Sequence, residues 1–189
     1  MVDPLLFKTF PDDLPRPVDD GEADHLTGLP MPDVVLPSTM GQRVALNRIP
    51  GRVVIYAYPM TGQPDVPLPA GWNDIPGARG CTPESLGFKA VDARFSALGI
   101  AVFGLSTQDT DYQREMAQRL GLPFPVLSDA GLALTHALRL PTMEVAGMTL
   151  LKRLTLIVRD GVIEQVFYPV FPPDEAAATV LAWLESQAS

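Results

Sequence analysis

The longest apolar runs of the chain predict β-strands. Residues 53–58 and 100–105 are almost continuously apolar and contain several β-branched side chains, as expected for strands that are buried on both faces. Residues 150–158 and 162–168 form two further runs, and they flank Asp160 and Gly161, a dipeptide that strongly favours a hairpin turn. The pattern therefore predicts two central strands and, later in the chain, a β-hairpin.

A second group of apolar positions recurs at helical spacing. The side chains that share this helical face are Phe88, Val91, Phe95 and Leu98. Thr82 is the predicted N-cap of this helix, Pro83 its first residue and Glu84 an acid in its first turn. Gly99 is the predicted end. The helix therefore begins directly after the proline- and glycine-rich loop that follows the first central strand.

Shorter patterns complete the order of elements. Short β-like runs occupy residues 33–36, 43–46 and 124–127, and helical patterns occupy residues 111–120, 130–138 and 174–186. The resulting order is β, β, β, α, β, α, β, α, β, β, α. Two βα units that are followed by a hairpin and a closing helix predict an α/β fold with a mixed central β-sheet flanked by helices.

The first 28 residues differ in composition from the rest. They are rich in acids and prolines, so residues 1–28 are predicted to form an extended or loosely packed arm. The apolar side chains near its start are candidates to dock on the main domain or on a second subunit; they are Leu5, Leu6, Phe7 and Phe10. Residues 29–189 are predicted to form one domain, because 189 residues suffice for one packed core and are few for two.

The net charge narrows the range of partners. A formal charge of −8 argues against nucleic acid, whose binding depends on neutralising phosphates, and against an anionic membrane surface. No apolar run approaches the roughly 20 residues that a membrane span needs. Seven acids within the first 30 residues argue against a signal peptide, and a single cysteine suits a reducing compartment. We therefore expect a soluble, cytoplasmic protein.

Cys81, the only cysteine, is the candidate reactive group. It follows a glycine-rich loop and immediately precedes a capped helix, and Arg79 lies two residues before it. A helix N-terminus and a nearby cation both favour the thiolate, which is the nucleophilic form of cysteine. The alternative is a small buried hydrophobe, which is the commoner role of a lone intracellular cysteine.

Several motifs together resemble the peroxiredoxins, the alkyl hydroperoxide reductase and thiol-specific antioxidant superfamily. Tyr58-Pro59 at a strand end, followed by Gly80-Cys81-Thr82-Pro83-Glu84 at a helix start, is similar to the bacterioferritin-comigratory branch of that family. Supporting segments are residues 28–33, 104–107, 124–129 and 153–157, so the resemblance covers roughly residues 29–186. It implies a thioredoxin-like fold, in agreement with the predicted order of elements.

The resemblance also implies a mechanism. Cys81 is then the peroxidatic cysteine, which attacks a hydroperoxide and becomes a sulfenic acid. Arg153, on the strand that enters the hairpin, corresponds to the arginine that holds the thiolate; its plainer role is an ordinary arginine paired with an acid. Glu84 corresponds to the acid of the helix start, and an interaction with the helix dipole explains it equally well.

Two departures from the family pattern stand out. The family has a proline seven residues before the cysteine and a threonine or serine three residues before it, where this chain has Asp74 and Ala78. Pro59 and Thr61 are the candidates to replace them, which makes residues 62–80 an insert. The branch often carries a second cysteine five residues after the first, where this chain has Leu86. The resemblance therefore implies a one-cysteine enzyme that is reduced by an external thiol such as thioredoxin, glutaredoxin or a small thiol.

Other functions have less support. His25, His136 and Cys81 lack the spacing of metal ligands, and the sequence contains no phosphate-binding or dinucleotide fingerprint, so neither a metal nor a cofactor is expected. His136 is expected on a helix surface or half-buried. A non-catalytic redox-sensing or binding module on the same scaffold stays open, as does a structural domain with an inert thiol whose pKa is at or above about 8.5. A homodimer is a further open alternative.

Overall fold

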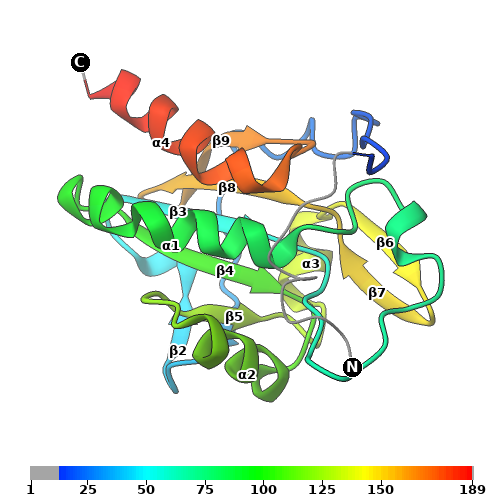
Figure 1. The fold of residues 1–189 in the computed structure, drawn as a ribbon. Helices are drawn as coiled ribbons and strands as arrows, with labels where there is room; N and C mark the ends of the chain where they lie inside the picture. The colour runs from blue at the N-terminus through cyan, green and yellow to red at the C-terminus, as the bar shows by residue number, and fades with distance from the viewer. Residues whose placement is uncertain (1–12, 189) are drawn as a thin grey trace.

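A five-stranded sheet forms the centre of the computed structural model, which describes residues 13–188 (Figure 1). Its strand order is β5-β4-β3-β8-β9, with β3 parallel to β4 and antiparallel to β8. The strands are β5 (Val126–Ser128), β4 (Ala101–Ser106), β3 (Arg52–Ala57), β8 (Leu154–Arg159) and β9 (Val162–Phe167). The predicted mixed sheet is confirmed, and the two continuous apolar runs form its central strands β3 and β4.

Helices cover both faces of this sheet. α1 (Cys81–Ala97), α2 (Thr110–Leu120) and α4 (Ala176–Gln187) pack on one face, where they share an apolar cluster with β3 and β4. α3 (Ala133–Leu138) packs on the other face. The predicted face of α1 is confirmed at Phe88 and Phe95, both fully buried, whereas Leu98 is 41% exposed because the helix already ends at Ala97.

The segment before the sheet belongs to the same packed body. β1 (Val35–Pro37) pairs with β2 (Arg43–Ala45), and a 3-10 turn at Leu46–Arg48 follows. Later in the chain, two further 3-10 turns lie at Trp72–Asp74 and Pro173–Glu175. Leu26 is fully buried, and the backbone N–H of Gly28 donates to the carbonyl oxygen of Ile163 over 2.8 Å. The end of the predicted arm, around Leu26 and Gly28, is therefore packed against the domain. The four apolar residues near its start lie outside the described residues, and the division at residue 28 stays a prediction.

The predicted single strand over residues 150–158 is wrong. β6 (Thr142–Val145) and β7 (Met148–Leu151) form a separate two-stranded hairpin that the sequence reading missed. β8 begins at Leu154, so the chain leaves the hairpin and enters the central sheet across Lys152 and Arg153. The apolar run is thus divided between two sheets, because β7 pairs with β6 and β8 pairs with β3. Arg153 therefore lies in the break and not on a strand.

Residues 62–80, the predicted insert, form a packed loop beside this hairpin (Figure 1). Trp72 is 4% exposed and shares an apolar cluster with Met60, Ala78, Val145 and Leu150. By contrast, Val66 is 45% exposed. The insert thus covers the end of β3 at which the chain turns toward α1.

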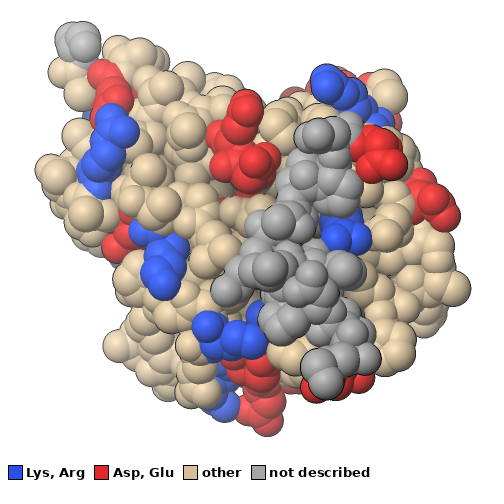
Figure 2. Space-filling view, viewed as in Figure 1, with Lys and Arg blue, Asp and Glu red and all other residues tan. Residues whose placement is uncertain are grey.

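The surface carries mixed charge. In Figure 2 the acidic and basic side chains of the described residues are scattered over the viewed face and do not form one broad basic patch. Among residues 13–188, no helix combines the length and the apolar character that crossing a bilayer requires.

Candidate active site

Cys81 is the first residue of α1, where the loop from β3 enters the helix. The N-cap is Gly80, whose φ of 108° is a conformation that side chains with a Cβ rarely adopt. The Cys81 side chain is buried, and its thiol donates to the carbonyl oxygen of Ala78 over 3.6 Å. The predicted N-cap at Thr82 is therefore wrong by two residues. Pro83 is tolerated in the first turn because the N–H groups there have no helical partner.

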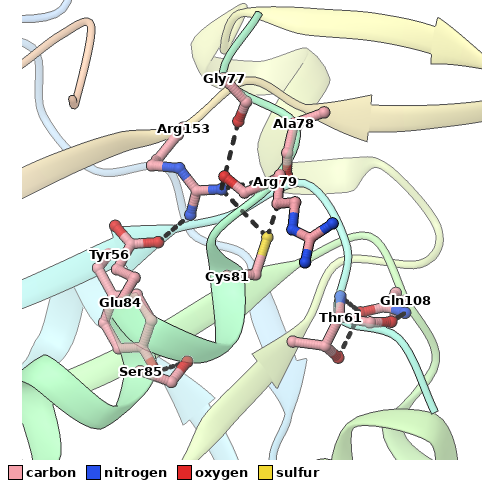
Figure 3. Close-up of polar contacts among 10 residues, drawn as sticks. All are labelled: Tyr56, Thr61, Gly77, Ala78, Arg79, Cys81, Glu84, Ser85, Gln108 and Arg153. Carbon is pink, nitrogen blue, oxygen red and sulfur yellow. Dashed lines mark hydrogen bonds and ion pairs between the residues drawn. The ribbon is translucent and has the colours of Figure 1, made fainter. Parts of the chain in front are cut away.

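Arg153 brings the site together (Figure 3). Its guanidinium is buried, and Nη2 donates to Cys81 Sγ over 3.2 Å. The same nitrogen lies 3.2–3.3 Å from the carbonyl oxygens of residues 77–79, and Nη1 pairs with Glu84. One arginine thus fixes the end of the insert, the thiol and the first turn of α1.

Burial and charge oppose each other at the thiol. Burial raises the pKa of Cys81, the positive charge of Arg153 lowers it, and the negative charge of Glu84 raises it. The backbone N–H of Met60 also lowers the pKa of Cys81, by a smaller amount. The net pKa is above the ordinary value, contrary to the expectation that the helix start would lower it. The thiolate therefore depends on Arg153 and on the charge state of Glu84.

Glu84 lies one turn after Cys81 and is fully buried. Burial raises the pKa of its carboxyl group to about 7, against the opposing effect of Arg153. Its Oε1 has no hydrogen-bond partner among the described residues, which disfavours the ionised form in a buried site. Near neutral pH, Glu84 can therefore release Arg153 from charge pairing by taking up a proton. Glu84 is more than a partner of the helix dipole.

Packed aromatic side chains connect the start of α1 to the central sheet. Tyr56 of β3 donates a hydrogen bond to Ser85 Oγ over 3.0 Å, and its ring stacks on Phe88 at a centroid distance of 4.4 Å. Gly104 of β4 leaves the necessary room, because a Cβ there would lie 3.0 Å from the Tyr56 hydroxyl oxygen. These contacts fix the helix that carries Cys81 on the sheet.

The two remaining predicted site residues follow β3. Thr61 is buried and lines the same cavity as Cys81, but its hydroxyl donates to Gln108 Oε1 over 3.4 Å. Two further hydrogen bonds join Gln108 to the backbone N–H and carbonyl of Thr61. Pro59 is buried in the segment that leads from β3 to Thr61. The structure thus brings Thr61 to the cavity of the thiol without a hydrogen bond from its hydroxyl to the sulfur.

Sequence reasoning missed Gln108 and the Met60 N–H. Gln108 follows β4, which ends beside β3 in the parallel pair. The carboxyl ends of neighbouring parallel strands are the usual place for functional groups in an α/β sheet. The position of Gln108 after a predicted central strand could therefore have identified it as a candidate site residue. A backbone N–H leaves no such signal in a sequence.

The cavity at Cys81 is small and partly apolar. It measures about 20 Å³, and its walls include side chains from the insert and the start of α1. The residues that line it are Met60, Thr61, Gly62, Leu68, Trp72, Arg79, Gly80, Cys81, Thr82 and Pro83. The arrangement provides a nucleophilic sulfur, a cation beside it and space for a small molecule.

The two histidines lie apart from this site. His136 is exposed on α3, as predicted for a helix surface, and His25 is half-buried with Nε2 2.8 Å from the carbonyl oxygen of Leu138. Within residues 13–188, no three His, Cys, Asp or Glu side chains gather as they would around a metal ion.

The comparisons with known proteins agree with this geometry. Residues 26–181, most of the chain, match the model of the Redoxin family. Peroxiredoxin Q, a chloroplastic protein of Oryza sativa subsp. japonica, is 28% identical over 161 residues, which is 84% of this chain and 66% of the rice protein. The putative peroxiredoxin bcp of Coxiella burnetii is 31% identical over 103 residues, 54% of this chain and 58% of that protein. The chain therefore spans somewhat less than two thirds of these relatives.

A solved structure gives the same result. The crystal structure of peroxidoxin BcpB from Mycobacterium tuberculosis matches with a TM-score of 0.71 at 25% identity, over 87% of this chain and all of that one. The predicted thioredoxin-like fold is thereby confirmed. The chain belongs to the Redoxin family, and within it to the peroxiredoxins that resemble peroxiredoxin Q and the bacterioferritin-comigratory proteins.

Proposed function

We propose that this protein is a thiol peroxidase that reduces hydroperoxides through Cys81. The observation that carries the proposal is the buried Cys81 sulfur, 3.2 Å from the guanidinium of Arg153 at the start of α1. A nucleophilic thiolate and a leaving oxygen both develop negative charge, and a fixed cation beside them stabilises both. Membership of the peroxiredoxins supports the same activity.

The first half-reaction oxidises the sulfur by two electrons. The Cys81 thiolate attacks the distal oxygen of the peroxide, an S–O bond forms and the O–O bond breaks. The departing oxygen takes a proton and leaves as water or an alcohol, and Cys81 becomes a sulfenic acid. Arg153 holds the thiolate and balances the charge that develops on the leaving oxygen. Protonated Glu84 leaves the charge of Arg153 available to the sulfur.

The second half-reaction needs a reductant from outside the chain. Cys81 is its only cysteine, so no second thiol in this sequence can attack the sulfenic acid. An external thiol attacks the sulfenic sulfur, a mixed disulfide forms and water leaves; a second thiol then releases Cys81 as the thiol. We propose thioredoxin, glutaredoxin or a small thiol as the donor.

Pro59 and Thr61 are proposed to take the places of the proline and threonine of the family pattern. Pro59 directs the chain from β3 into the site, and Thr61 lines the cavity of the thiol. Gln108 holds the backbone of Thr61 on both sides, so it keeps this segment at the rim of the cavity. The Thr61 hydroxyl can donate a hydrogen bond to a bound peroxide only by giving up the one that it donates to Gln108.

A redox sensor on the same scaffold is the second candidate function. The raised pKa of Cys81 favours it, because a thiol that is mostly protonated reacts slowly. A sensor would be oxidised without efficient turnover. We propose the cytoplasm as the compartment for either function, since a single cysteine suits reducing conditions. A homodimer also stays a proposal.

Peroxide consumption coupled to a thiol reductant tests the proposed function. Wild-type protein should consume hydrogen peroxide in the presence of NADPH, thioredoxin reductase and thioredoxin, or of the matching glutaredoxin system. Cys81→Ser should abolish this activity. Undiminished peroxidase activity in Cys81→Ser would rule out the proposal, whereas stoichiometric oxidation of the wild type without turnover by any thiol would favour the sensor.

A further inference from the structure

The insert gives the Cys81 cavity a wall of its own. Trp72 is almost fully buried in the apolar cluster that joins the insert to the β6–β7 hairpin, and Leu68 packs against that cluster. Both side chains line the cavity of the thiol, together with Met60. The wall is anchored by packing on a second element, so it is a fixed part of the site.

The size of the cavity limits what fits beside the sulfur. A cavity needs about 10–15 Å³ to hold one water molecule, and about 150 Å³ to hold benzene. The Cys81 cavity of about 20 Å³ therefore accommodates a molecule little larger than water. Hydrogen peroxide fits inside this space, whereas the phenyl or branched alkyl group of an organic hydroperoxide has to lie outside it, against its wall.

A larger apolar groove lies on the other side of the same wall. It measures about 470 Å³, and its lining includes Val66, Tyr112 and Met148. Met60, Gly62 and Leu68 line both spaces. Of the three, Leu68 is the apolar side chain that the insert contributes, so Leu68 with Met60 separates the thiol from a space that an organic group could occupy.

We propose that Leu68 is a specificity-determining residue that restricts Cys81 to hydrogen peroxide and similarly small hydroperoxides. The inference rests on the proposed peroxidase function and specifies its substrate class. The chemistry is the same for either substrate: the sulfur takes the distal oxygen, and the rest of the peroxide leaves with a proton as water or an alcohol. What differs is the room for the organic group while the distal oxygen approaches Sγ.

The test compares hydrogen peroxide with cumene hydroperoxide as oxidants of Cys81. Sulfenic acid is trapped with dimedone and followed by intact mass, so the rates depend on no choice of reductant. For wild-type protein we expect a second-order rate constant at least about tenfold higher for hydrogen peroxide. Leu68→Ala should join the two spaces and raise the cumene hydroperoxide rate at least about fivefold, with little change for hydrogen peroxide.

Val66→Ala is the matched control, because Val66 lines the groove but not the Cys81 cavity. It should leave the ratio of the two rates unchanged. Comparable wild-type rates with both oxidants would overturn the inference, and so would a Leu68→Ala variant that changes both rates equally. The wild-type ratio provides this test even if Leu68→Ala does not fold. Failure of hydrogen peroxide to oxidise wild-type Cys81 would instead overturn the proposed function itself.

Discussion

Arg153→Met removes the cation from the site and keeps an unbranched side chain of similar length. Two unit charges 3.2 Å apart attract by about 5 kcal/mol at an effective dielectric constant of about 20. At 1.36 kcal/mol per pKa unit, losing this attraction raises the pKa of the Cys81 thiol by up to about 4 units. Protonation of Glu84 offsets part of this rise. We therefore expect the rate constant with hydrogen peroxide to fall at least about a hundredfold at neutral pH.

The same change affects stability through Glu84. Removing one partner of a buried ion pair costs about 3–5 kcal/mol, because the remaining charge stays buried without compensation. Glu84 takes up a proton readily, since its pKa is already raised to about 7, so the loss should lie at the low end of this range at pH 6. The double variant Arg153→Met/Glu84→Gln should recover stability without recovering the rate. This result would separate the chemical role of Arg153 from its structural one.

The assay follows sulfenic acid formation by intact mass, with urea unfolding measured on the same samples. Arg52→Met is the control, because Arg52 pairs with Glu164 over 2.7 Å at the start of β3 and makes no described contact with Cys81. It should leave the peroxide rate within about threefold of wild type. A folded Arg153→Met protein that kept the wild-type rate would refute the role assigned to Arg153.

Three further predictions follow from the same geometry. Glu84→Gln should lower the pKa of Cys81, because a neighbouring negative charge is removed; the pH profile of iodoacetamide alkylation should shift to lower pH, and an unshifted profile would contradict the coupling. The folded-state pKa of Glu84 lies above its unfolded value, so its contribution to stability should be fully present below about pH 4.5 and be lost as pH rises through about 7. The free energy of unfolding of wild type, measured with urea, minus that of Glu84→Gln should therefore fall by about 3 kcal/mol or less over this pH range. A difference that stays constant with pH would refute the raised pKa of Glu84. Thr61→Ala should slow oxidation by hydrogen peroxide about tenfold or more if the hydroxyl serves the peroxide, while Thr61→Ser keeps the rate; an unchanged rate in Thr61→Ala would remove Thr61 from the mechanism.

Much of the fold follows from periodicity in the sequence. The strands β3 and β4 are buried on both faces, and such strands carry a continuous apolar signal. The hairpin around Asp160 and Gly161 is confirmed, as β8 and β9 pair on either side of that turn. In these cases the signal lies within the element itself, so no knowledge of distant partners was needed.

The errors arose where distant contacts decide the structure. Residues 150–158 look like one strand, yet β7 pairs with β6 and β8 pairs with β3, and the charged pair Lys152-Arg153 is the local mark of the break. The helix begins at Cys81 instead of after Thr82 because Gly80 adopts the left-handed conformation.

The site was predictable in its residue types and not in its electrostatics. Cys81 was identified from its place at a predicted helix start and Arg153 through the resemblance, and the structure brings them within hydrogen-bond distance. The raised pKa of Cys81 was expected only for the alternative of an inert thiol, because burial depends on the whole packed domain. It was also not predictable from the sequence that the insert lines the site, since Trp72 reaches the cavity only by packing against the β6–β7 hairpin.

The central claim is that Arg153 makes Cys81 a peroxide-reactive thiol. The second-order rate constant of Cys81 sulfenic acid formation with hydrogen peroxide, measured near neutral pH beside free cysteine, tests it most directly. We expect Cys81 to react faster than free cysteine by several orders of magnitude, and Arg153→Met to lose most of this advantage. A wild-type rate equal to that of free cysteine would contradict it.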